Sequence, residues 1–188
     1  MSRRSALTWA IAFIVLALIG GGGSGAVDDL VSNDGGGSPD RQIDSQPRRG
    51  ATLHGRVIRV VDGDTIKVLL EPGRYETVRY IGVDTPESVK PDTPVQCFAK
   101  QASAFNERLV EGREVRLQVG RERRDRYGRL LAYVYVTGDR PVFVNAALVR
   151  GGYARTLEIA PNTDRADFFA RLESRARAAG RGLWAACE

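Results

Sequence analysis

The sequence predicts an α+β domain in which five β-strands form a small barrel and three α-helices pack around it. Three observations support this fold class. Short segments rich in β-branched residues end at turn residues such as Asp62-Gly63 and Pro72-Gly73. Apolar residues recur at helical spacing over residues 98–110. The 188 residues are 43% hydrophobic, which is enough to fill one core.

Five segments have the composition of β-strands, and turn or loop residues separate them. They cover residues 53–61, 65–70, 77–83, 114–119 and 130–136. The turn signal Asp62-Gly63 joins the first two segments and predicts a hairpin. A charged loop over 121–128 separates the last two. Five short strands suit a small closed barrel of the oligonucleotide-binding (OB) kind.

Three segments predict helices. They are residues 98–110, residues 142–149 and a longer segment that begins after 161–163. In the first, Phe98, Ala102 and Phe105 fall on one helical face, and in the last Phe168 and Leu172 do the same. Glycines follow the first two segments and favour helix ends there. Strands followed by helices on the outside indicate an α+β arrangement.

The first 26 residues have the layout of a signal peptide. Arg3 and Arg4 precede an uncharged stretch over 6–19, and small residues at 24–26 follow as a cleavage site. We favour cleavage, because glycines at 20–25 form a poor helix end. An uncleaved signal anchor is the alternative, since a bilayer needs about 20 apolar residues and the glycines would extend the span. Either reading places the rest of the chain outside the cytoplasm, secreted or anchored in the membrane.

Residues 27–50 predict a flexible linker, because Gly, Ser, Pro and Asp dominate without an apolar period. Residues 51–188 then form the predicted folded domain, which carries a basic excess equal to the chain's formal net charge of +5. This excess fits an anionic partner. A single histidine excludes chemistry that needs two imidazoles, and two cysteines exclude a four-cysteine zinc site.

Acidic, basic and turn-forming residues gather in three segments. The segments are Val-Asp-Gly-Asp-Thr at 61–65, Arg-Tyr-Ile-Gly-Val-Asp-Thr-Pro-Glu at 79–87 and Asp-Arg-Tyr-Gly-Arg at 125–129. Each alone is typical of an acidic turn, a strand end or a solvated loop. Together, in this order and at this spacing, they resemble the staphylococcal nuclease-like (thermonuclease) family.

The resemblance covers about residues 51–185. It extends to the segments 102–105, 131–135, 145–149 and 182–184. It implies an OB-fold-like five-stranded barrel with three helices, which agrees with the pattern of strands and helices. It also implies an enzyme that hydrolyses phosphodiester bonds of nucleic acid and leaves 3′-phosphates.

The acidic residues have the chemistry of a calcium site. Asp64 and Asp84 are hard oxygen donors at strand ends, which suits Ca²⁺ better than a soft metal. The backbone carbonyl of Thr85 would complete the protein ligands, and Asp62 would orient a water molecule beside the ion. The resemblance implies that the residues matching Asp64, Asp84 and Thr85 bind calcium.

Glu87, Arg79 and Arg129 supply the remaining chemistry of phosphodiester cleavage. Glu87, beyond the turn at Pro86, can hold or deprotonate the attacking water. Arg79 and Arg129 have planar guanidinium groups that pair with two phosphate oxygens at once. The resemblance implies catalytic roles for these three residues. An isolated Asp–Arg pair is ordinarily a surface salt bridge, but several carboxylates at one barrel corner destabilise the fold unless cations share the site.

The basic loop contains further candidates for substrate contacts. The resemblance assigns Arg126 and Tyr127 to a terminal phosphate of the bound nucleotide. Arg121, Arg123 and Arg124 extend the basic loop, either as contacts along a phosphate backbone or as solvated side chains.

The chain departs from the family after Ala154. The family places tyrosines there to stack on a base, whereas this chain has Arg-Thr-Leu-Glu-Ile-Ala at 155–160 and is one residue shorter before Pro161. Such stacking is worth about 1–3 kcal/mol per base. We therefore expect weaker nucleotide binding or a different base preference, with the chemistry retained.

Cys97 and Cys187 lie outside the three segments. An exported chain favours a disulfide between them, which would close a loop of about 90 residues and hold the C-terminal segment. Two free thiols are the alternative.

The sequence thus predicts a secreted or membrane-anchored, calcium-dependent nuclease that acts on DNA and RNA with little sequence preference, because phosphate contacts carry no sequence information. We expect a monomer that contacts the membrane only through an uncleaved N-terminal segment. The alternatives are a non-catalytic nucleic-acid-binding OB-fold module and a surface adhesion or scaffold module. The sequence leaves open the preference for DNA or RNA and the choice between ends and interiors of strands.

Overall fold

The structure is a computed structural model that describes residues 47–87 and 94–187. These residues belong to one compact unit, Ile43–Glu188. The predicted signal peptide at 1–26 and all but the last residues of the predicted linker at 27–50 lie outside the described residues. Within the described ranges, no helix combines the length and the apolar character that a membrane crossing requires.

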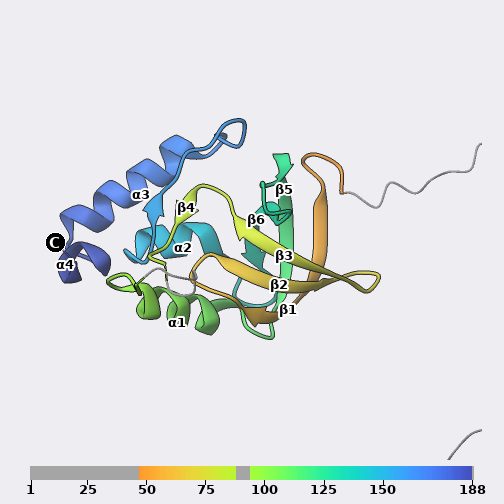
Figure 1. The fold of residues 1–188 in the computed structure, drawn as a ribbon, viewed down its shortest axis with the longest axis horizontal. Coiled ribbons are helices and arrows are strands. Elements are labelled where there is room, and N and C mark those ends of the chain that lie inside the picture. Colours follow the sequence, from red (N-terminus) through yellow and green to blue (C-terminus); the bar gives the residue numbers. More distant parts are fainter. Residues whose placement is uncertain (1–46, 88–93, 188) are drawn as a thin grey trace, which may run out of the picture. The chain divides into compact units, whose positions relative to one another are not determined.

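Five strands form a closed barrel (Figure 1), as the sequence predicts. They are β1 (Thr52–Val60), β2 (Thr65–Leu70), β3 (Arg74–Tyr80), β5 (Glu114–Arg124) and β6 (Leu130–Val136). Neighbours pair antiparallel in the order β3-β2-β1-β5-β6, and a parallel pairing of β3 with β6 closes the barrel. Val78 is opposite Leu130 in this closing pair, and both are completely buried.

Short strands extend the barrel toward the helices. β7 (Val142–Phe143) pairs with β6, and β4 (Val83–Asp84) pairs with β8 (Arg155–Thr156). The barrel interior is filled by alternate residues of the long strands, since successive side chains of a strand point to opposite faces. Ile66, Val68 and Leu117 are examples, and all three are fully buried.

Four helices occur in the described part of the chain, one more than predicted. They are α1 (Ala99–Val110), α2 (Val144–Arg150), α3 (Ala166–Ala178) and α4 (Leu183–Ala186). Figure 1 shows the helices at one end of the domain and the long barrel strands at the other. The C-terminal α4 lies close to the beginning of α1.

Two predicted elements differ in detail. β5 continues to Arg124, so the first half of the stretch 121–128 predicted as a loop is a strand. In α3 the buried residues are Phe169, Leu172 and Ala176, whereas Phe168 is only half-buried. α3 begins at residue 166, later than the predicted start after 161–163, and Phe168 packs against the barrel core beside the more deeply buried Phe169.

A disulfide joins Cys97 to Cys187, with 5.9 Å between the Cα atoms. It connects the residues just before α1 with the residue just after α4. Leu183 and Trp184 of α4 form a small apolar cluster with Ala176, against which Phe98 packs. This cluster is separate from the barrel core.

Candidate active site

The turn between β1 and β2 brings Asp62 and Asp64 to one corner of the barrel. The Asp62 carboxylate accepts a hydrogen bond from the Asp64 backbone N–H at 3.0 Å, which fixes the turn. A Cβ on Gly63 would lie 2.6–2.8 Å from three side-chain atoms of Thr85. Glycine is therefore required here, because it lets the turn approach the end of β4.

Asp64 is held by Thr85, which directly follows β4, and by Arg79 of β3. Its Oδ2 accepts hydrogen bonds from the Thr85 backbone N–H at 2.8 Å and the Thr85 hydroxyl at 3.0 Å. Its Oδ1 lies 3.1 Å from Nε of Arg79 on β3. The side chain is only 6% exposed, so these bonds offset the cost of burying the charge.

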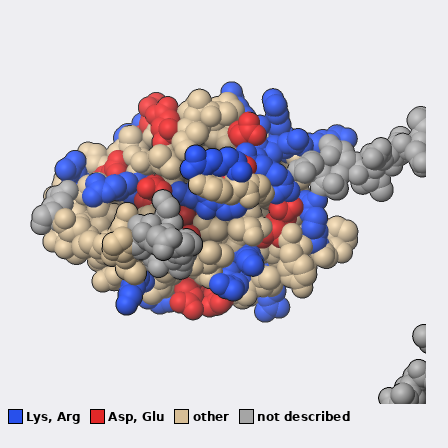
Figure 2. Space-filling model, viewed as in Figure 1, with Lys and Arg blue, Asp and Glu red and all other residues tan. Residues whose placement is uncertain are grey.

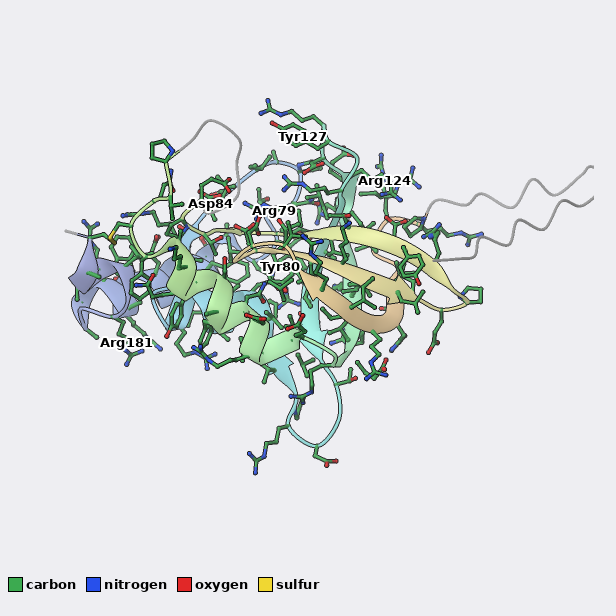
Figure 3. The ribbon with its side chains drawn as sticks, turned by 60° about the horizontal axis from the view of Figure 1, so that its bottom comes forward. Arg79, Tyr80, Asp84, Arg124, Tyr127 and Arg181 are labelled. Carbon is green, nitrogen blue, oxygen red and sulfur yellow. A yellow bond between two sulfur atoms is a disulfide. The ribbon has the colours of Figure 1, made fainter. Side chains whose placement is uncertain are left out.

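Arg79 lies between two carboxylates. Nη2 donates to Oδ1 of Asp84 at 2.9 Å while Nε faces Asp64. Nη1 donates to the carbonyl oxygens of Val83 at 2.7 Å and Tyr80 at 3.0 Å. Figure 3 shows Arg79 and Asp84 next to each other. The guanidinium that the sequence assigned to phosphate binding is thus also oriented by the acidic residues of the same corner.

The acidic corner carries more negative charge than its arginines neutralise. Burial, followed by the charge of Asp64, raises the pKa of Asp62 to about 6. Burial also raises the pKa of Asp84, and the charges of Asp64 and Glu87 add to the rise against the opposing effect of Arg79. A further cation in this corner would relieve the repulsion.

A hollow of about 170 Å³ collects the predicted site residues on one surface. It is lined by Asp62, Asp64, Arg79, Asp84, Thr85, Pro86, Glu87 and Arg129. The structure therefore brings together all six residues to which the resemblance gave metal or catalytic roles, and Asp62 lines the same hollow. Figure 2 shows basic side chains gathered across the middle of one face of the molecule, with acidic side chains among them.

Arg129 reaches the hollow from the loop between β5 and β6. Asp125 fixes it, because the carboxylate accepts from the Arg129 backbone N–H at 3.0 Å and from its Nε at 2.7 Å. Nη1 of Arg129 lies 3.4 Å from the hydroxyl of Thr65, which neighbours Asp64. One edge of the guanidinium is therefore bound to the loop, and the other faces the site.

Arg126 and Tyr127 lie beside this loop rather than in the hollow. The guanidinium groups of Arg126 and Arg129 both lie over the Tyr127 ring, with Cζ 4.8 and 5.3 Å from its centroid. The phenol oxygen accepts a hydrogen bond from Nη2 of Arg126 at 2.7 Å. Tyr127 is 67% exposed, so both residues remain accessible to a ligand.

The three other arginines of this region form contacts within the protein. Arg121 pairs with Asp164 at 2.7 Å, and Arg123 donates to the carbonyl of Pro47 at 3.1 Å. Arg124 pairs with Glu76 through two hydrogen bonds of 3.0 and 2.8 Å. These arginines thus have partners distant in sequence, and their contacts along a phosphate backbone stay a prediction.

Asn106 of α1 supports the site and was not singled out in the sequence. It is completely buried; its Nδ2 donates to the carbonyl of Asp62 at 3.1 Å, and its Oδ1 accepts from the Tyr80 hydroxyl at 3.0 Å. Burial raises the pKa of Tyr80 and keeps this phenol neutral. The available signal was a polar residue on the helical face that Ala102 and Val110 also occupy.

A second cavity of about 570 Å³ lies next to the site. Arg79, Tyr127 and Arg129 line it on one side. Leu157 and Ile159, from the segment where the sequence lacks the family's tyrosines, contribute an aliphatic wall.

The fold and the site together define a class of protein: an OB-type barrel with acidic residues and arginines at one corner. The sequence model of the family described as "Staphylococcal nuclease homologue" matches residues 77–186. Among curated relatives, the thermonuclease of Staphylococcus hyicus is 40% identical over 129 residues, which cover 69% of this chain and 74% of the relative. The chain therefore belongs to the staphylococcal nuclease homologue family.

Other relatives match over part of their length. The thermonuclease of Staphylococcus intermedius is 49% identical over 106 residues, or 56% of this chain and 61% of the relative. Endonuclease YncB of Bacillus subtilis (strain 168) is 43% identical over 128 residues, or 67% of this chain and 59% of the relative. The matched region thus spans about three fifths of these two relatives.

Proposed function

We propose that this protein is an extracytoplasmic, calcium-dependent nuclease that hydrolyses phosphodiester bonds of DNA and RNA with little sequence preference. The class, a phosphodiester hydrolase, follows from membership of a family whose relatives are thermonucleases and endonucleases. The finer proposal is carried by one observation: Asp64, Asp84 and Arg79 meet within hydrogen-bond distance in a hollow that Glu87 and Arg129 also line.

The donor set of this corner fits a hard divalent cation. Asp64, Asp84 and the Thr85 carbonyl would hold calcium, which prefers oxygen ligands and accepts several water molecules. Burial, followed for Asp62 by the charge of Asp64, raises the pKa of Asp84 and of nearby Asp62, and a bound cation would offset this by favouring the charged carboxylates. Residues 47–87 and 94–187 contain no group of three or more His, Cys, Asp or Glu side chains arranged for a metal. The protein would thus supply few of the calcium ligands. Water molecules and a substrate phosphate would supply the others.

When bound, calcium supplies positive charge beside the reacting phosphate. The chain's own residues do the rest. Glu87 accepts a proton from the water that attacks phosphorus, because a carboxylate on the wall of the hollow is suited to general-base catalysis. Arg79 and Arg129 donate hydrogen bonds to phosphate oxygens, whose negative charge grows in the transition state. The 5′ oxygen leaves, and the product carries a 3′-phosphate.

The proposed location outside the cytoplasm rests on the N-terminal sequence and on the disulfide. Disulfides persist mainly in oxidising compartments, and the Cys97–Cys187 bond fits such a place. The protein would be secreted, or anchored through an uncleaved N-terminal segment, and would act as a monomer.

Digestion of single- and double-stranded DNA and of RNA, with calcium and then with a chelator, tests the proposed function. We expect cleavage of all substrates only with calcium. Asp84→Asn is the informative variant, because the Asp84 side chain is 56% exposed and its loss is compatible with folding. It should require far more calcium for half-maximal activity, whereas Asp139→Asn, an exposed residue in a turn, should behave as wild type. Binding of nucleic acid without cleavage would favour the non-catalytic alternative.

A further inference from the structure

A reciprocal pair of hydrogen bonds holds the backbone of Glu87. Its N–H donates to Oε1 of Gln96 at 2.8 Å, and its carbonyl oxygen accepts from the Gln96 backbone N–H at 3.0 Å. Both groups of Glu87 that fix its peptide orientation are thus bound by one residue. Pro86 precedes Glu87 and restricts the chain on the other side. Gln96 therefore holds the stretch of backbone from which the Glu87 side chain extends.

The position of Gln96 depends in turn on the disulfide. Gln96 itself is exposed, so packing does not hold it. The next residue, Cys97, is bonded to Cys187, and Phe98 follows with φ of 68°, the one non-glycine residue in the described ranges with a positive φ. Such a conformation persists only where the surroundings impose it. The disulfide imposes it from one side, and stacking of Phe98 on Tyr153, at 5.5 Å, from the other.

We propose that Gln96 is a positioning residue for Glu87 and that the Cys97–Cys187 disulfide holds Gln96 in place, so that reduction of this bond lowers turnover. The inference rests on the proposed nuclease function. Its path is short: one covalent bond, one peptide link and the reciprocal hydrogen bonds join Cys187 to Glu87. The bonds that hold Asp64 and Arg79 are not on this path.

The redox step is thiol–disulfide exchange with a dithiol reductant. One thiolate of the reductant attacks a sulfur of the protein disulfide and releases the first protein thiolate. The second thiolate of the reductant then attacks the reductant's own sulfur in the mixed disulfide and releases the second protein thiolate, and both protein thiolates take up protons. The protein S–S bond breaks, two protein thiols form, and the reductant becomes a disulfide, with two electrons transferred. Cys97 is exposed, which gives the reductant access. The enzyme would be less active in a reducing compartment and reach full activity where the disulfide forms.

Gln96→Ala tests the positioning role, with Gln101→Ala, an exposed residue of α1, as the matched control. We expect Gln96→Ala to lower kcat about fivefold, which corresponds to one hydrogen bond. KM should stay within about twofold, because the arginines that bind phosphate are unchanged. The control should keep the wild-type kcat. A Gln96→Ala variant with wild-type kcat would overturn the proposal, as would an equal loss in the control.

Reduction of the full-length protein by dithiothreitol, followed by reoxidation, tests the coupling. Wild type should lose kcat by a factor similar to that of Gln96→Ala and recover it on reoxidation, with an unchanged far-ultraviolet circular dichroism spectrum. Reduction of the Gln96→Ala variant should lower its kcat by less than a further twofold, since the substitution and the reduction act through the same contact. The coupling would be overturned if the kcat losses from reduction and from Gln96→Ala were independent and multiplied. Loss of the folded circular dichroism spectrum on reduction would overturn it as well. An oxidised wild type that does not cleave with calcium would instead refute the proposed function.

Discussion

Asn106→Ala is the most informative perturbation of the site's support. Asn106 is completely buried and binds both the Asp62 carbonyl and the Tyr80 hydroxyl. Its truncation leaves the buried Tyr80 hydroxyl and the partly buried Asp62 carbonyl without this partner, at about 1–3 kcal/mol each. We therefore expect the free energy of unfolding to fall by about 3 kcal/mol or more. The measurement is urea denaturation followed by tryptophan fluorescence, analysed as a two-state transition.

The same substitution in a Tyr80→Phe background separates the two bonds. Phenylalanine has no hydroxyl to leave unpaired, so Asn106→Ala should cost about 1–2 kcal/mol less there than in wild type. Gln101→Ala, on the exposed side of the same helix, should change stability by less than about 0.5 kcal/mol. Equal costs of Asn106→Ala in the two backgrounds would refute the role of the hydrogen bond. The half-activating calcium concentration should also rise in Asn106→Ala, because the turn that carries Asp62 is released.

Three further predictions concern the site itself. Arg79→Lys should reduce kcat on single-stranded DNA by about 100-fold or more, since one ammonium cannot bind two carboxylates and a phosphate together. A loss of kcat below tenfold would contradict this. Without calcium, protonation of Asp62 should stabilise the fold at about pH 4, and this contribution should be lost as the pH rises through about 6, because the pKa of Asp62 in the folded state lies above its ordinary value of 3.8. With calcium, the melting temperature should instead rise over the same pH range. Thermal melts at several pH values measure both effects. Leu157→Tyr should tighten inhibition by a nucleoside bisphosphate at least fivefold through base stacking, and unchanged inhibition would show that the aliphatic wall does not contact the base.

The barrel was predictable because its signals are local. Turn residues such as Asp62-Gly63 and runs of β-branched residues mark strands without reference to distant residues. The start of α3 was predicted too early, and its most deeply buried aromatic residue is Phe169 rather than the predicted Phe168. α4 was not predicted, since four residues are too few for a helical period to show.

The identity of the site residues was predictable, but their partners were not. The resemblance carried by the order and spacing of the acidic and basic segments implied that Asp64 and Arg79 belong to one site. The sequence did not reveal that Arg79 lies between Asp64 and Asp84, because this depends on where β4 leaves the barrel. Likewise the sequence alone does not distinguish Arg124 from a solvated cation, because its partner Glu76 is 48 residues away. Contacts at such separations carry no local pattern.

The central claim is that Glu87 acts as general base in a corner that binds phosphate and calcium. The most direct test is the single-turnover rate of DNA cleavage at saturating calcium for wild type and Glu87→Gln, together with calorimetric calcium binding. The account predicts a rate at least 100-fold lower in the variant with nearly unchanged calcium affinity, since the amide cannot accept the proton. A variant that cleaves within threefold of wild type would contradict it.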